Sequence, residues 1–198
     1  MHVVDEKILL WINGLVGKSA VLDRIMILFA NDYFVPVLLS LILLGLWFQG
    51  KNMAERENYQ RAIIVAAVSM GSACGFVMAA NHLYYHPHPF QAMPQLMGTV
   101  NHIFYPIHDP SFPSNTSAVT FACATSIWQR SHKIGWFLFI PAILMPFAKV
   151  YAAVYWPSDV VAGAILGILT AYFIKLVVHL LEPFVSIFFK VARKICLA

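Results

Sequence analysis

The residues with the most useful chemistry lie in three short segments separated by apolar stretches. The first contains His-Pro-His-Pro at residues 86–89, and the second, residues 111–117, contains serines, an asparagine and a threonine. The third, residues 149–159, contains a lysine, two tyrosines and an aspartate. Ammonium, hydroxyl and imidazole groups bind phosphate, and a histidine can also attack phosphorus or supply a proton. We therefore expect the three segments to form one site.

The second and third segments carry donors suited to an anion. Ser114 is expected to cap the helix that follows it, and the N-terminus of a helix favours negative charge. Lys149 lies near the end of an apolar stretch, where an ionisable residue is a candidate for function or simply reaches towards the interface. The residues predicted to bind a phosphate or lipid head group are Ser114, Asn115, Thr116, Lys149 and His88.

Five of the eight histidines lie within residues 82–108. Histidine is the commonest metal ligand, but their spacing matches no standard zinc signature and no cysteine lies nearby. Hydrogen-bonded or surface histidines are the simpler interpretation, and pH sensing is a third. No metal or other cofactor is expected, and the weak metal candidates are His82, His86, His88, His102 and His108.

The composition predicts an all-α integral membrane helical bundle. Of the 198 residues, 60% are hydrophobic and 11% charged, whereas soluble domains carry about 25% charged residues. Because a membrane helix needs about 20 mostly apolar residues, we expect about five to six membrane helices. The stretches are residues 21–48, 62–82, 114–128, 134–150 and 157–181, and Asn31 and Asp32 interrupt the first.

The flanking segments predict the orientation of a single domain, residues 1–198. Residues 1–18 are typical of an interfacial helix, and residues 183–198 of a basic amphipathic tail. Lysines and arginines gather in alternate loops, which places those loops in the cytoplasm. Residues 83–113 contain neither, and this long loop is expected to be extracytoplasmic.

Small residues predict close helix packing. Gly71 and Gly75 are four residues apart in one apolar stretch, and Gly163 and Gly167 in another. Such pairs let membrane helices approach one another closely.

The chain resembles the type 2 phosphatidic acid phosphatase (PAP2) superfamily, and most closely the bacitracin-resistance type of undecaprenyl-diphosphatase. The resemblance rests on the order and spacing of His-Pro-His-Pro-Phe at residues 86–90, Ser-Phe-Pro-Ser at 111–114 and Tyr-Trp-Pro-Ser-Asp-Val at 155–160. It implies a lipid phosphate phosphatase with three motifs. The first grips phosphate with a lysine and an arginine, the second supplies a histidine acid, and the third has an arginine, a histidine nucleophile and an orienting aspartate.

Most residues at these positions differ from the family pattern. The acid histidine is replaced by Thr116 and the nucleophile by Tyr155. The three cations become Asn81, His88 and Lys149. A phenol with a pKa near 10 is a poor nucleophile at neutral pH. The aspartate remains, so the degenerate catalytic positions are Asn81, His88, Thr116, Lys149, Tyr155 and Asp159.

These replacements predict a PAP2-like protein without the family's catalysis. We expect it to bind a lipid phosphate or diphosphate, such as a polyprenyl phosphate, or to serve as a membrane subunit for a partner protein. The first alternative is an undecaprenyl-diphosphate or related lipid phosphatase with an unorthodox site. The second is a His-rich metal-binding membrane protein. No patch for nucleic acid is present in the sequence.

Overall fold

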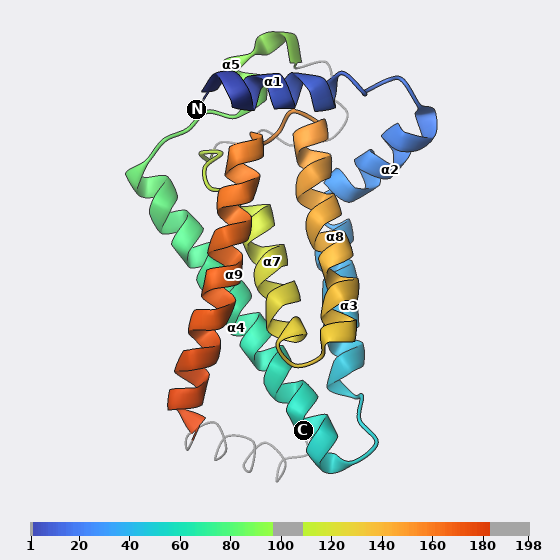
Figure 1. Ribbon diagram of the computed structural model, residues 1–198, viewed down its shortest axis with the longest axis vertical. Helices are drawn as coiled ribbons and strands as arrows, with labels where there is room; N and C mark the ends of the chain where they lie inside the picture. The colour runs from blue at the N-terminus through green and yellow to red at the C-terminus, as the bar shows by residue number, and fades with distance from the viewer. Residues whose placement is uncertain (1, 97–108, 183–198) are drawn as a thin grey trace.

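The computed structural model describes residues 2–96 and 109–182, which form eight α-helices and a short 3-10 helix (Figure 1). The predicted tail, residues 183–198, and the candidates His102 and His108 lie outside the described residues. The helices are α1 (His2–Asn13), α2 (Ala20–Ala30), α3 (Phe34–Trp47), α4 (Met53–Leu83), α5 (Pro89–Ala92), α7 (Asn115–Trp128), α8 (His132–Tyr151) and α9 (Pro157–Leu180), and the 3-10 helix is η1 (Pro94–Leu96).

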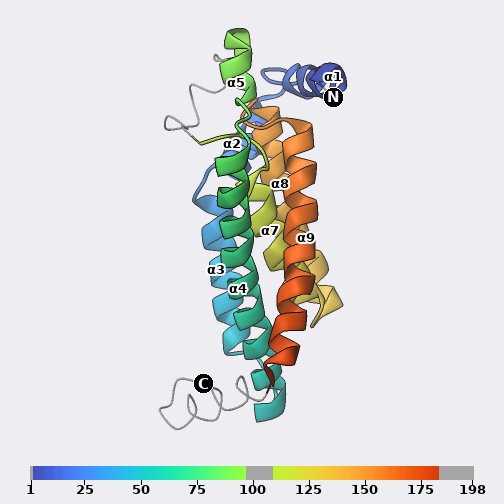
Figure 2. The same ribbon diagram turned by 90° about the vertical axis from the view of Figure 1, so that its left-hand side faces the viewer.

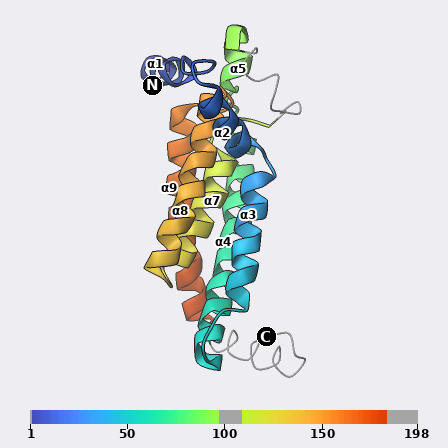
Figure 3. The ribbon, with the colours of Figure 1, turned by 90° about the vertical axis from the view of Figure 1, so that its right-hand side faces the viewer.

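Helix α7 forms the centre of the bundle. It packs against α4, α8 and α9, while α3 packs against α4 and α8 (Figures 2 and 3). Most of its residues are buried, including several small polar ones. Helix α1 lies across one end of the bundle, which we call the α1 end (Figure 1). The protein is thus all-helical, as the sequence predicts.

Side chains at the helix starts explain several boundaries. Ser114 accepts a hydrogen bond from the backbone N–H of Ser117, which confirms its predicted role as the cap of α7. Asn52 accepts from the N–H of Glu55 at 2.8 Å and begins α4. Pro157 occupies the first turn of α9, where its missing N–H carries no penalty. These local signals place the ends of α7 and α9 next to the candidate site.

Fewer continuous spans are present than the five to six predicted. Within the described ranges, α4, α8 and α9 are long and apolar enough to cross a membrane, and the pair α2 and α3 would add one span. That pair is bent by 63° at residues 31–33, so the stretch predicted at residues 21–48 is broken. Helix α7 has 14 residues, or about 21 Å, which is less than a hydrocarbon core of about 30 Å. It lies inside the bundle instead.

The two glycine pairs behave differently. A Cβ atom at Gly163 would lie 2.4 Å from the carbonyl oxygen of Ser114, and one at Gly167 would lie 2.2 Å from that of Ala118. The prediction of close packing is therefore confirmed for α9, which presses against α7. It is wrong for Gly71 and Gly75, because nothing lies within 4 Å of a Cβ atom there.

Residues 2–13 form the helix predicted at the N-terminus. Its buried residues Leu9 and Ile12 face the bundle, whereas Trp11 is 72% exposed. The carboxylate of Asp5 accepts hydrogen bonds from the backbone N–H and the hydroxyl of Ser158 in the first turn of α9. A carboxylate there satisfies backbone donors and complements the helix dipole. This contact ties α1 to the start of α9.

Candidate functional site

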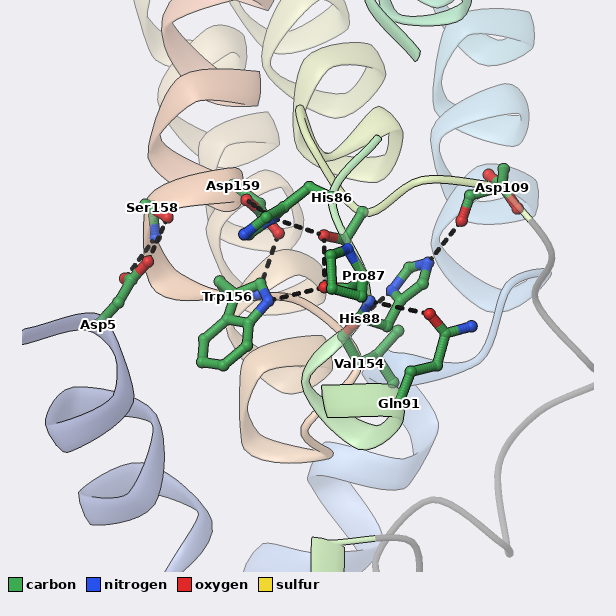
Figure 4. Close-up of polar contacts among 11 residues, drawn as sticks. Asp5, His86, Pro87, His88, Gln91, Asp109, Val154, Trp156, Ser158 and Asp159 are labelled. Atoms are coloured by element: carbon green, nitrogen blue, oxygen red, sulfur yellow. Dashed lines mark hydrogen bonds and ion pairs between the residues drawn. The ribbon is translucent and has the colours of Figure 1, made fainter. Parts of the chain in front are cut away.

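The three chemically interesting segments meet at the α1 end, as the sequence predicts (Figure 4). The first leaves α4, the second leads into α7, and the third joins α8 to α9. The backbone N–H of Ser111 donates to the carbonyl of His86 at 2.8 Å, and that of Ser114 donates to the carbonyl of Asp159 at 3.0 Å. The indole N–H of Trp156 donates to a carbonyl of the first segment at 2.9 Å. Hydrogen bonds to backbone carbonyls therefore hold the three segments in one cluster.

His88 is fully buried between two other segments (Figure 4). Its Nδ1 lies 2.7 Å from the carbonyl oxygen of Val154, and its Nε2 lies 3.0 Å from that of Asp109. Both ring nitrogens therefore face backbone carbonyl oxygens, which only accept hydrogen bonds. In this arrangement His88 fastens the loops together instead of presenting donors to a ligand.

His86 is next to the retained aspartate. Its Nδ1 lies 3.3 Å from the carboxylate of Asp159 and 3.0 Å from the hydroxyl of Ser111. Asp159 is fully buried, and its second oxygen accepts from the backbone N–H of Trp156 at 3.3 Å. The rings of Trp156 and Tyr84 lie about 6.0 Å from that of His86, centroid to centroid. A histidine and aspartate pair therefore exists here, with the histidine supplied by the first segment.

Lys149 and Asp32 form an ion pair at the end of α8. The lysine side chain is almost completely buried, with 4% exposed, whereas that of the aspartate is 51% exposed. The ring of Tyr155 lies 5.9 Å from the ammonium, which adds a cation–π contact. The site therefore contains a buried positive charge whose carboxylate partner comes from the break between α2 and α3.

Tyr155 lies beside Thr116, whose hydroxyl acts on its phenol. Tyr155 is 6% exposed, and its burial raises the pKa of its phenol above the usual range. The nearby carboxylate of Asp109 raises that pKa further, while the neighbouring Thr116 hydroxyl opposes the rise. The phenol is therefore neutral at neutral pH, and the pair consists of two uncharged hydroxyl groups.

Two asparagine side chains in the site have buried oxygens without a hydrogen-bond partner among the described residues. They are the Oδ1 atoms of Asn115, in the first turn of α7, and Asn81, near the end of α4. An unsatisfied buried acceptor is uncommon in native structures. Ser114 differs from them, because its side chain already accepts a hydrogen bond as the cap of α7.

In the described part of the chain, no three His, Cys, Asp or Glu residues are grouped so that they could hold a metal ion. Of the predicted candidates, His82 is exposed, His86 contacts Asp159 and His88 is held by carbonyls. The metal hypothesis therefore has no support from these three histidines.

Comparison with known proteins agrees with this arrangement. The family model of the PAP2 superfamily matches residues 62–182, which include all three segments. The chain belongs to the PAP2 superfamily. Undecaprenyl-diphosphatase BcrC of Bacillus subtilis is 28% identical over 93% of this chain and 89% of its own. The putative undecaprenyl-diphosphatase YbjG of Escherichia coli is 30% identical over 80% of this chain and 74% of its own.

Solved structures support the PAP2 fold. The crystal structure of Aquifex aeolicus LpxE matches with a TM-score of 0.60 and 23% identity, over 85% of this chain and 92% of that one. The transmembrane PAP2-type phosphatidylglycerolphosphate phosphatase of Bacillus subtilis matches with a TM-score of 0.54 and 18% identity, over 88% of this chain and 86% of that one. At these identities the likeness concerns the fold alone.

Three contacts at the PAP2 site were missed by sequence reasoning. They are those between His86 and Asp159, Lys149 and Asp32, and Ser158 and Asp5. The polar interruption at residues 31–32 was a visible signal for the second contact, although it predicted only a break in the helix. For the other two contacts, the motif spacing gave no signal, because His86 and Asp5 both lie outside the third segment, which contains Asp159 and Ser158.

Proposed function

We propose that this PAP2 protein binds the phosphate or diphosphate head group of a polyprenyl-type lipid on the extracytoplasmic side and does not hydrolyse it by the family's two-histidine route. The observation that carries the proposal is that a buried phenol, Tyr155, and a hydroxyl, Thr116, occupy the nucleophile and acid positions. Relatives named as undecaprenyl-diphosphatases support the choice of lipid.

The chemistry of this pair argues against the covalent route. A raised pKa keeps Tyr155 neutral, and a neutral phenol is a weak nucleophile. The Thr116 hydroxyl does not ionise near neutral pH, so it cannot replace a histidine as general acid. Losing both groups removes formation of the phosphoenzyme and protonation of the leaving oxygen.

Binding needs fewer groups than catalysis, and several are present. Lys149 supplies a buried ammonium beside the retained motif, and burial strengthens its attraction to an anion. Asn115 and Thr116 stand in the first turn of α7, whose N-terminus favours negative charge. A phosphate ester is therefore a suitable ligand for this end of the bundle.

The test uses purified protein in lipid nanodiscs, with undecaprenyl phosphate and undecaprenyl diphosphate as ligands. We expect saturable binding of both lipids, no binding of undecaprenol, and phosphate release no faster than in empty nanodiscs. Failure to bind either phosphorylated lipid would refute the proposal. Release above that background would refute the expectation that the protein binds the lipid without turnover.

A second candidate function is hydrolysis of lipid diphosphates through His86. The specific observation is the contact of His86 with Asp159. Asp159 stands at the position where the PAP2 motif has the aspartate that orients the nucleophile. His86 would attack the terminal phosphorus and break the bond to the bridging oxygen, and water would later hydrolyse the phosphohistidine. The leaving group is then a lipid phosphate anion, which needs no proton, so a diphosphate tolerates Thr116 better than a monophosphate does.

The same nanodiscs distinguish this second candidate. Phosphate release from undecaprenyl diphosphate that is abolished by His86→Ala, and retained in the control His82→Ala, would establish it. His82 is a suitable control because its side chain is exposed and lies on α4 near the same end. Equal release from both variants, or none from the unmodified protein, would exclude His86 as a nucleophile.

A further inference from the structure

In the ion pair between Lys149 and Asp32, the lysine is buried and the aspartate is exposed. The lysine belongs to the last turn of α8 and its side chain is enclosed, whereas the Asp32 side chain is about half exposed. The lysine side chain is enclosed by its neighbours, whereas the exposed aspartate side chain can rotate away without disturbing the packing around α8. The pair can therefore open on the side of Asp32.

The break between α2 and α3 brings this carboxylate to the site. The Oδ1 atom of Asn31 accepts hydrogen bonds from the backbone N–H groups of Tyr33 and Phe34, at 2.8 and 3.1 Å. This interaction fixes the start of α3 after the bend of 63°. Without the break, an apolar helix would run on and Asp32 would be a charge among membrane side chains, which is costly.

We propose that Asp32 is an internal anion that pairs with Lys149 when no lipid phosphate is bound. The head group then binds by displacing Asp32 from Lys149. This inference rests on the proposed function. Carboxylate and phosphate oxygens are alike in accepting charge-assisted hydrogen bonds from an ammonium. The head group would take the position of the carboxylate, and Asp32 would turn into solvent at the α1 end.

Asp32 then sets the affinity of the site. We call the ion pair between Asp32 and Lys149 the latch; it is closed when the pair is formed and open when Asp32 has turned away. If the latch is closed for most of the time, the apparent affinity for the head group falls in proportion to the fraction of protein in which it is open. Removing the charge of Asp32 while keeping its size should therefore tighten binding. Removing the charge of Lys149 should abolish binding of the head group, because no ammonium is then left to bind the phosphate.

The experiment compares Asp32→Asn, Lys149→Met and the control Glu6→Gln in nanodiscs. Glu6 is exposed on α1, so its variant loses one negative charge at the same end without touching the latch. The ligands are undecaprenyl phosphate, inorganic diphosphate and undecaprenol. We expect Asp32→Asn to bind the lipid phosphate about tenfold or more tightly than the unmodified protein. We expect Glu6→Gln to bind like the unmodified protein, and Lys149→Met not to bind.

The ligands separate the possible sources of the anion. Tighter binding of inorganic diphosphate as well as lipid phosphate would show that the phosphate alone displaces Asp32, whereas tightening with the lipid alone would show that the chain is required. Both results support the latch. Equal tightening in Glu6→Gln and Asp32→Asn would overturn it by indicating a general charge effect.

A measurement on the unmodified protein keeps the test valid if Asp32→Asn does not fold. The side-chain carboxylate of Asp32 should change its NMR signal when undecaprenyl phosphate binds, because it leaves the ammonium for water. Saturable binding with an unchanged signal, or with unchanged affinity in a folded Asp32→Asn variant, overturns the latch but leaves the proposed function in place. No lipid phosphate binding by any variant overturns both.

Discussion

The two ends of the bundle each use a cation to join helices, but in different surroundings. Away from the α1 end, Arg61 on α4 contacts Glu57 one turn earlier, at 2.9 Å, and Glu182 just after α9. These three side chains are partly exposed. At the α1 end, Lys149 is almost fully buried and Asp32 joins it from another helix pair.

Under the proposed function, the difference separates a cation that joins helices from one that binds the ligand. Exposed ion pairs contribute about 0–1 kcal/mol, and exchanging one partner changes little. A buried ammonium is costly unless it is paired, so a chain that needs only a joint between helices gains little from placing one there. The ion pairs of Arg61 therefore only connect α4 with the end of α9. Lys149, in contrast, places a positive charge where the head group is proposed to bind.

The largest expected effect tests this division directly. Lys149→Met should lower the affinity for undecaprenyl phosphate by at least about 100-fold, to no measurable binding, because it removes a desolvated charge. Arg61→Met removes a cation of the other end and should leave that affinity unchanged. Titration of both variants in nanodiscs measures the difference. Equal losses would mean that net charge, and not the buried site, controls binding.

A moderate effect is expected on stability. Asp32→Asn should lower the free energy of unfolding by about 1–3 kcal/mol, because the buried ammonium exchanges a charged partner for a neutral one. Glu182→Gln should change it by less than about 1 kcal/mol, since Arg61 retains Glu57. Thermal unfolding in detergent compares the two variants. A larger loss in Glu182→Gln would reverse the proposed roles of the ends.

The smallest effect concerns Tyr155. Because folding raises the pKa of its phenol, its contribution to stability is fully present below the unfolded pKa of about 10. That contribution is lost as the pH rises through the folded pKa. Tyr155→Phe should therefore leave binding between about pH 6 and pH 9 unchanged and reduce the loss of stability above about pH 10. A change in the neutral pH profile of binding would show that the phenol takes part.

Much of the fold follows from local sequence signals. Ser114 caps α7 where the apolar run predicts a helix to begin, and Gly163 and Gly167 allow the expected approach of α9. The number of spans was overestimated because an apolar run of 14 residues suits the interior of a bundle as well as part of a membrane span. Hydropathy describes the preference of a segment for apolar surroundings, and neighbouring helices can supply those surroundings as well as lipid.

The sequence alone determined which chemical groups are present and which are missing. Thr116 and Tyr155 stand where the PAP2 pattern has histidines, and motif spacing is enough to establish those replacements because it is a local property. The tertiary structure decided the partners. Lys149 and Asp32 are 117 residues apart in the chain, and they meet because α2 bends towards α8. Pairings of this kind depend on how helices pack and bend, so the motif spacing contains no record of them.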